Sequence, residues 1–194
     1  MILDSKIGAG KIVLIGVSLE ALIVLFCVLT QGVTLEALQT ITRFSGRLSL
    51  LAFSLILLLY DKPGAVRLDR AFLLFAILHG IHLIELLSYV ALSGVELIPT
   101  RVAGGFVAYA MIFAMPVINA RKEEGRISVS TYNRIEDVFF LYVWLIFFLT
   151  YLPRVMGKLP NVGGTHTEHV VLFSWVVLLG LIKTIEKLGP KFSS

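Results

Sequence analysis

The sequence predicts an all-α integral membrane protein, a bundle of six transmembrane helices with both termini in the cytoplasm. Of the 194 residues, 57% are hydrophobic and only 15% are charged, whereas a typical soluble domain is about 45–50% apolar and about 25% charged. The mean hydropathy is +0.90, and the apolar residues lie in long blocks. We therefore expect a single transmembrane domain over residues 1–194, embedded in the lipid bilayer of a bacterial or archaeal plasma membrane.

The first three predicted spans are residues 12–31, 44–60 and 70–93. Each is near the roughly 17–25 residues that cross the hydrocarbon core of a bilayer. The first is longer than the core of a signal peptide, which is about 7–15 residues, and no small-residue cleavage site follows it. We interpret it as a retained helix. The second has a short apolar core, so its ends must include polar residues, and a Pro-Gly turn in 61–69 separates it from the third.

The last three predicted spans are residues 97–119, 137–153 and 167–184. Pro116 is expected to bend or end the fourth. A charged loop precedes the fifth, where Glu136 and Asp137 suit a helix N-terminus. The sixth, like the second, has a short apolar core. The sequence shows no alternation of apolar and polar residues that would indicate strands. Helices also form all their backbone hydrogen bonds internally, as the lipid environment requires.

The placement of lysine and arginine predicts the orientation of the bundle. Twelve of the 17 basic residues fall on one side: Lys6, Lys11, Lys62, Arg67, Arg70, Arg121, Lys122, Arg126, Arg134, Lys183, Lys187 and Lys191. The other five fall on the opposite side: Arg43, Arg47, Arg101, Arg154 and Lys158. Cytoplasmic loops carry the excess of positive charge, so both termini are expected in the cytoplasm. No basic-aromatic patch indicates a nucleic-acid partner.

Ionisable residues inside the apolar spans are the candidates for function. The segment FAILHGIHLIELL holds His79, His82 and Glu85, which the helical step places on a stripe about 120° wide. A charge at the centre of such a helix costs about 2.5–3.5 kcal/mol, and these residues tend to be functional. The stripe indicates a haem or metal ligand, with Glu85 supporting it or carrying protons; core histidines bonded to helix carbonyls are the alternative. Glu20 is either a protonated acid bonded to a neighbouring helix or part of a proton pathway with Glu85.

Two further histidines, His166 and His169, lie at the start of the sixth span. We interpret His166 as an interfacial residue. His169 is deeper and is a candidate partner for His82 in haem binding, although His82 lies roughly 15 Å from the outer end of its helix. His79 as the lone ligand is a second arrangement. A third is a non-haem metal site made by His79, His82, Glu85 and His169.

The second and third spans together resemble a known family. FSGRLSLLAFSLILLLY (44–60) and RAFLLFAILHGIHLIELLSYV (70–90) are similar to the ferric-reductase-like transmembrane domain, nearest to the small bacterial haem subunit of methionine sulfoxide reductase systems. The glycine- and alanine-rich fourth span extends the resemblance, which covers about 44–120. It implies six helices, haem b held through His79, and electrons taken from a cytoplasmic reductase or a quinol donor. The histidines that the family carries in its fifth helix are missing from 135–155. Three alternatives remain: His166 or His169 ligates the haem, the haem is held from one side, or the chain is a relative that binds no haem.

Two functions follow as hypotheses. The first is a membrane-embedded b-type haem protein that transfers electrons for a separate partner reductase or from quinol, because the chain has no room for a flavin or nicotinamide domain. The second is a non-redox membrane protein, either a small transporter or a structural subunit of a membrane complex. Its buried His and Glu residues would then handle protons or a metal ion.

Overall fold

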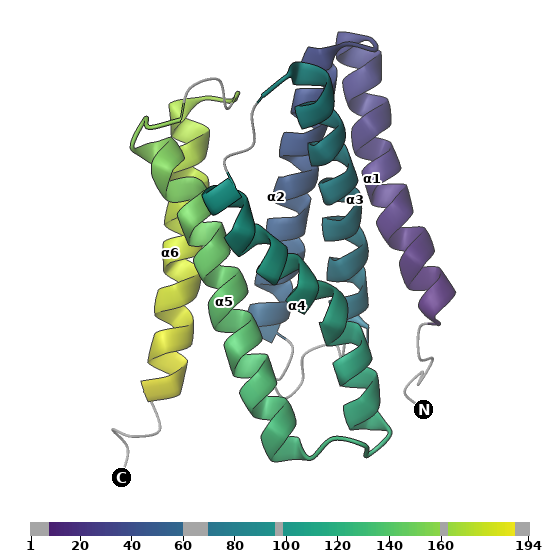
Figure 1. Cartoon of the computed structure of the whole chain (residues 1–194), viewed down its shortest axis with the longest axis vertical. Helices are drawn as coiled ribbons and strands as arrows, with labels where there is room; N and C mark the ends of the chain where they lie inside the picture. The colour runs from purple at the N-terminus through teal and green to yellow at the C-terminus, as the bar shows by residue number, and fades with distance from the viewer. Residues whose placement is uncertain (1–7, 60–69, 96–98, 160–162, 189–194) are drawn as a thin grey trace. The chain divides into compact units, whose positions relative to one another are not determined.

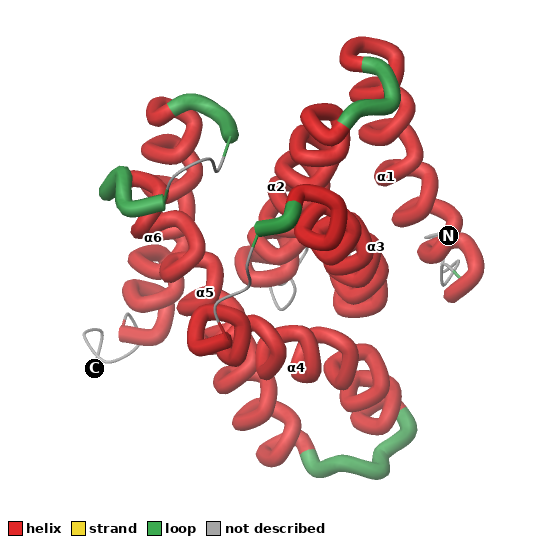
Figure 2. The backbone as a smooth tube through the Cα atoms, turned by 45° about the horizontal axis from the view of Figure 1, so that its top comes forward, coloured by secondary structure: helices red, strands yellow, loops and turns green. Residues whose placement is uncertain are grey.

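The computed structural model describes residues 8–59, 70–95, 99–159 and 163–188, and within these ranges all regular structure is helical (Figures 1 and 2). The helices are α1 (Ala9–Gln31), α2 (Leu35–Leu59), α3 (Ala71–Ser93), α4 (Pro99–Glu123), α5 (Val129–Val155) and α6 (His166–Leu188). Each of these six contains a segment long and apolar enough to cross a membrane, as expected of a bundle of six transmembrane helices. The chain forms two units, Met1–Arg134 and Ile135–Ser194.

Two helices begin well before the predicted spans, because hydroxyl side chains and not apolar runs set their starts. Thr34 Oγ1 accepts a 3.0 Å hydrogen bond from the Ala37 amide, so α2 begins at Leu35 and not at residue 44. Ser128 Oγ accepts a 3.1 Å bond from the Thr131 amide and starts α5 at Val129. The interpretation of Glu136 and Asp137 as the N-terminus of the fifth helix was therefore wrong.

The fourth helix continues through its proline. Pro116 lies inside α4, which ends only at Glu123, so this proline does not end the helix. Gly125, with φ of +70°, follows the last turn, and the Arg126 amide donates a 2.8 Å bond back to the Arg121 carbonyl. The predicted turn at 61–69 lies outside the described residues.

In the first unit, α1, α2 and α3 lie side by side, and α4 runs obliquely beside α3 (Figure 1). The buried stripe of α1 is Ile12, Gly16, Glu20 and Cys27. Gly16 brings α1 close to α3: a Cβ built there would lie 2.8 Å from Cγ2 of Ile77. The stripe therefore places an acidic side chain, Glu20, in a close helix–helix contact.

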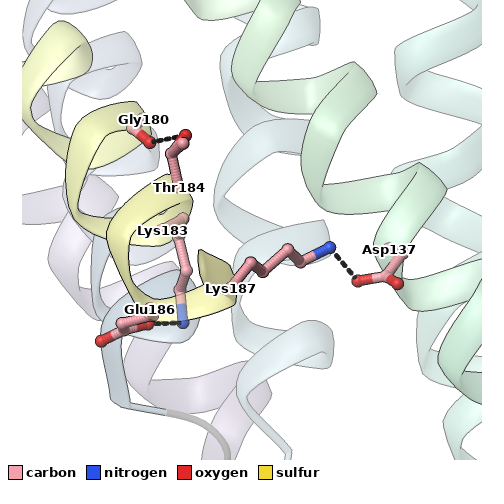
Figure 3. Close-up of polar contacts among 6 residues, drawn as sticks. All are labelled: Asp137, Gly180, Lys183, Thr184, Glu186 and Lys187. Carbon is pink, nitrogen blue, oxygen red and sulfur yellow. Dashed lines mark hydrogen bonds and ion pairs between the residues drawn. The ribbon is translucent and has the colours of Figure 1, made fainter. Parts of the chain in front are cut away.

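In the second unit, α5 and α6 are joined by aromatic and polar contacts. Trp144 Nε1 donates a 2.8 Å bond to the Val176 carbonyl, and the Phe148 and Phe173 rings lie 5.2 Å apart. Near the C-terminal end of α6, Lys187 Nζ lies 2.6 Å from Asp137 Oδ1 (Figure 3). Both of these charged groups are exposed.

Candidate functional site

The ionisable residues of α3 face three different neighbours. A step of three residues leaves an offset of about 60° around the helix axis, so His79, His82 and Glu85 spread over about 120° of the surface of α3. The His79 ring lies 4.7 Å from the Tyr109 ring of α4. His82 lies against Gly46 of α2, where an added Cβ would be 3.0 Å from its Cε1. Glu85 faces α1 and α2.

Glu85 meets Glu20 at a single serine of α2. The Ser45 hydroxyl donates a 2.9 Å hydrogen bond to Glu20 Oε1, and the Ser45 side chain also lies beside the Glu85 carboxyl group. The two carboxyl groups are close enough to interact electrostatically. Ser45 is fully buried, Glu20 is 2% exposed and Glu85 is 9% exposed. Three helices thus bring two acids and one hydroxyl together in an apolar setting.

Each acid keeps one oxygen that the described residues leave unbonded. Among these residues, Oε2 of Glu20 and Oε2 of Glu85 are buried and have no hydrogen-bond partner. A buried polar atom without a partner costs about 1–3 kcal/mol. Such a cost at two adjacent acids calls for a functional explanation.

Both acids line one groove between α1 and α3. The groove has a volume of about 480 Å³. It is lined by Val17, Glu20, Ala21, Val24, Leu25 and Val28 of α1 and by Ile81 and Glu85 of α3. Among the described residues that line it, the two glutamates are therefore the only ionisable ones, and they are set among aliphatic side chains.

The imidazoles of α3 lie in an aromatic cluster. The His79 ring lies 5.3 Å from Phe75 and 5.6 Å from His82, measured between centroids. Both histidines project from one helix and touch side chains or backbone of α2 and α4. The first unit therefore offers a haem iron imidazole ligands from α3 alone. Across the described ranges, no group of three or more His, Cys, Asp or Glu side chains is arranged to hold a metal ion.

The remaining predicted histidines belong to the second unit. His169 is buried, and its Nε2 lies 3.2 Å from the Gly163 carbonyl oxygen. His166 is exposed. Thr165 and Glu168 form a capping box around them: the Glu168 amide bonds Thr165 Oγ1 at 3.2 Å, and the Thr165 amide bonds Glu168 Oε2 at 3.0 Å. The predicted pairing of His82 with His169 joins residues of the two units and stays a prediction.

Ser45 is the site residue that the sequence analysis missed. A lone serine inside an apolar helix usually bonds its own backbone, so it carries little signal. The signal was the spacing of Thr42, Ser45 and Ser49, which places three hydroxyls on one buried face of α2. That face opposes the helices that carry Glu20 and Glu85.

Comparisons with protein-family models, with curated proteins and with solved structures give no match for this chain.

Proposed function

We propose that this chain is an integral membrane protein whose first unit binds a proton between Glu20 and Glu85 and transfers it through Ser45. One observation carries the proposal: a single buried hydroxyl bonds Glu20 and lies beside Glu85, on a helix that lies between the two acids in sequence. Ionisable groups held inside transmembrane helices commonly form proton relays. Six helices of membrane-spanning length and composition supply that setting.

The transfer follows from the chemistry of the hydroxyl. A serine has one hydrogen to donate and two lone pairs that accept. With Glu85 protonated, its hydrogen bonds Ser45 Oγ while the serine hydrogen bonds Glu20 Oε1. The Glu85 hydrogen then moves to Oγ as the serine hydrogen moves to Glu20. Ser45 ends with one hydrogen as before, and the negative charge has passed from Glu20 to Glu85.

The environment of the two acids disfavours the pair of carboxylates. Two carboxylates at one site repel each other, so a shared proton lowers the energy of the pair. Burial of both groups favours protonation further, since a charge without a counter-ion is costly away from water. The pair therefore keeps at least one proton, and its singly protonated form is the one that a relay uses.

Infrared difference spectroscopy on the protein in lipid vesicles tests the proposal. Titration from acid to neutral pH should change the carboxylic-acid carbonyl band, and Glu20→Gln and Glu85→Gln should each remove part of that change. Glu36→Gln is the matched control, because Glu36 is exposed at the start of α2. Spectra of both site variants that are identical to the wild type would refute the relay.

The orientation and the location belong to the same proposal. We place both termini on the cytoplasmic side of a bacterial or archaeal plasma membrane, supported by the unequal distribution of the 17 basic residues. Lys6, Lys62, Arg67 and Lys191 of that distribution lie outside the described residues. A reporter that is active only in the cytoplasm, fused after Ser194, should be active. If that fusion were inactive, and a reporter active only in the periplasm were active at the same position, the proposed orientation would be wrong.

Binding of b-type haem at α3 is the second candidate function. The arrangement that favours it is the pair of neighbouring imidazoles, His79 and His82, 5.6 Å apart between α2 and α4. Imidazole is a common axial ligand of haem iron, and a bound haem supplies one-electron transfer. In this function the chain orients the imidazoles through Phe75, Tyr109 and Gly46. A separate reductase or quinol supplies the electrons.

An absorption spectrum decides this candidate. Protein expressed with ample haem should show a Soret band that His79→Ala or His82→Ala removes, while His166→Ala, an exposed histidine of α6, leaves it unchanged. Colourless wild-type protein would reject the haem function and leave the carboxyl relay untouched.

A further inference from the structure

We propose that the groove between α1 and α3 binds a lipophilic monovalent cation in exchange for the proton on its two acids. This inference rests on the proposed function and adds a ligand class to the same site. It concerns the groove wall formed by Glu20 and Glu85, and it does not involve the histidines.

The unbonded oxygens are the first indication of a ligand. Both acids are more than nine-tenths buried, and both line the groove. Oε2 of each has no hydrogen-bond partner in the described part of the chain. Two unsatisfied acceptors thus belong to the acids that line the groove, and a positively charged or hydrogen-donating group would satisfy them.

The lining defines the rest of the ligand. Apart from the two glutamates it is aliphatic, and about 480 Å³ falls within the roughly 300–1,000 Å³ of small-molecule sites. A hard metal ion is a poor match, because Ca²⁺ takes about 6–8 oxygen ligands. The described residues also contain no group of three acidic, histidine or cysteine side chains suited to a metal. A ligand with an apolar body and one charged centre fits both the aliphatic lining and the two glutamates of the groove.

Charge balance favours a single positive charge. When the doubly protonated acid pair gives up one proton, it carries one negative charge, which a monovalent cation neutralises in a setting where unpaired charge is costly. Loss of the remaining proton leaves two negative charges, which draws the cation in more strongly. Cation binding and proton binding therefore compete, and uptake of one releases the other.

The groove is accessible from the apolar side of α1. Leu25 lines it and is 54% exposed, and the neighbouring Leu22 is 62% exposed. Within the first unit the groove is therefore continuous with an exposed aliphatic face. A molecule dissolved in hydrocarbon has a direct route along this face to the two acids.

Two probe ions of the same shape and opposite charge provide the test. Purified full-length protein in an uncharged detergent is titrated with tetraphenylphosphonium and separately with tetraphenylborate, by calorimetry at several pH values. The cation should bind saturably, more weakly at acid pH, and with release of a proton into weak buffer. The anion should not bind saturably. Equal binding of both ions would overturn the inference.

Variants link the binding to the groove. Glu20→Gln and Glu85→Gln should each weaken cation binding about tenfold or more, from loss of a charged partner. Ala21→Leu keeps both acids but fills the groove at an exposed position, so it should weaken binding even if the glutamine variants fold poorly. Leu22→Phe is its control, on the same exposed face but outside the lining. Unchanged affinity in Ala21→Leu would place the cation elsewhere and refute the site.

Failure of this inference is distinguishable from failure of the relay. A carboxyl band that responds to pH in protein that binds no tetraphenylphosphonium would overturn the cation site alone. A band that never responds to pH would overturn the relay, and the cation exchange with it.

Discussion

The indole ring of Trp144 on α5 lies directly over Gly180 on α6. A Cβ built at Gly180 would be 2.7 Å from Cζ2 and 2.8 Å from Cε2 of the indole, closer than real side chains approach. The indole nitrogen at the same time donates a 2.8 Å bond to the Val176 carbonyl, one turn earlier on α6. The glycine therefore forms the surface on which the tryptophan rests.

Gly180→Ala should destabilise the protein, because the indole cannot move without losing its hydrogen bond. Overfilling a close contact typically costs about 1–3 kcal/mol. The expected result is a lower thermal unfolding midpoint in detergent. Gly105→Ala in α4 is the control, since a Cβ built at Gly105 would have nothing within 4 Å. Equal midpoints for Gly180→Ala and the wild type would show that the contact is looser than described.

Gly16→Ala should weaken the contact of α1 with α3. The new methyl would lie 2.8 Å from Ile77 Cγ2, so α1 must shift outward. Gly10→Ala provides a control on the same helix, with open space at its Cβ. Limited proteolysis of the loop after α1 and thermal unfolding should both distinguish the two variants. Comparable behaviour of the two would contradict the close approach.

Ser45→Ala should both destabilise the protein and interrupt the relay. Glu20 Oε1 would lose its 2.9 Å donor, and a buried acceptor left unbonded costs about 1–3 kcal/mol. The infrared carboxyl band should shift in this variant, and proton exchange between the acids should slow. The measurements are thermal unfolding and the pH-dependent infrared spectrum.

Ser49→Ala is the matched comparison for that variant. Ser49 lies one turn along the same buried face of α2, and its hydroxyl has no hydrogen-bond partner among the described residues. Removing it should be neutral or stabilising, because no bond is lost. If Ser45→Ala and Ser49→Ala lowered stability alike, the loss would reflect packing and not the bonds to the acids.

Thr165→Ala should lower stability more than Lys187→Ala, although only the second removes an ion pair. Thr165 caps α6 through the Glu168 amide, and loss of a threonine cap costs about 1 kcal/mol. The side chains of Lys187 and Asp137 are 66% and 61% exposed, so their pair should contribute less than about 1 kcal/mol, decreasing with salt. Thr167→Ala, at an exposed neighbouring position, controls for the threonine change. The reverse order of the two unfolding midpoints would contradict this ranking.

The helices were predictable because length and hydrophobicity set them, but their starts were not. Apolar runs identified all six spans, yet α2 begins at Leu35 and α5 at Val129, each following a hydroxyl cap. A hydropathy pattern does not register a helical turn made of polar residues. The polar first turns of α2 and α5 are therefore visible only in the hydrogen bonds of Thr34 and Ser128.

The candidate site was predictable in its residues and not in its partners. Glu20, His79, His82 and Glu85 stood out because ionisable groups are rare in apolar helices. Helical periodicity describes one helix at a time, so it placed Glu85 with the histidines of α3. The structure brings it to Ser45 instead, which depends on how α1, α2 and α3 meet. No single-helix pattern contains that information.

The short connection between α1 and α2 has a consequence for biosynthesis. Only residues 32–34 separate the two helices, so α2 follows α1 closely from the ribosome, and the pair is suited to entering the membrane as a hairpin. Glu20 then receives its hydroxyl from the very next segment to be translated. Glu85 arrives later, when α3 docks on a hairpin whose acid already has a hydrogen-bond donor. The order of synthesis thus shields each acid in turn from bare hydrocarbon.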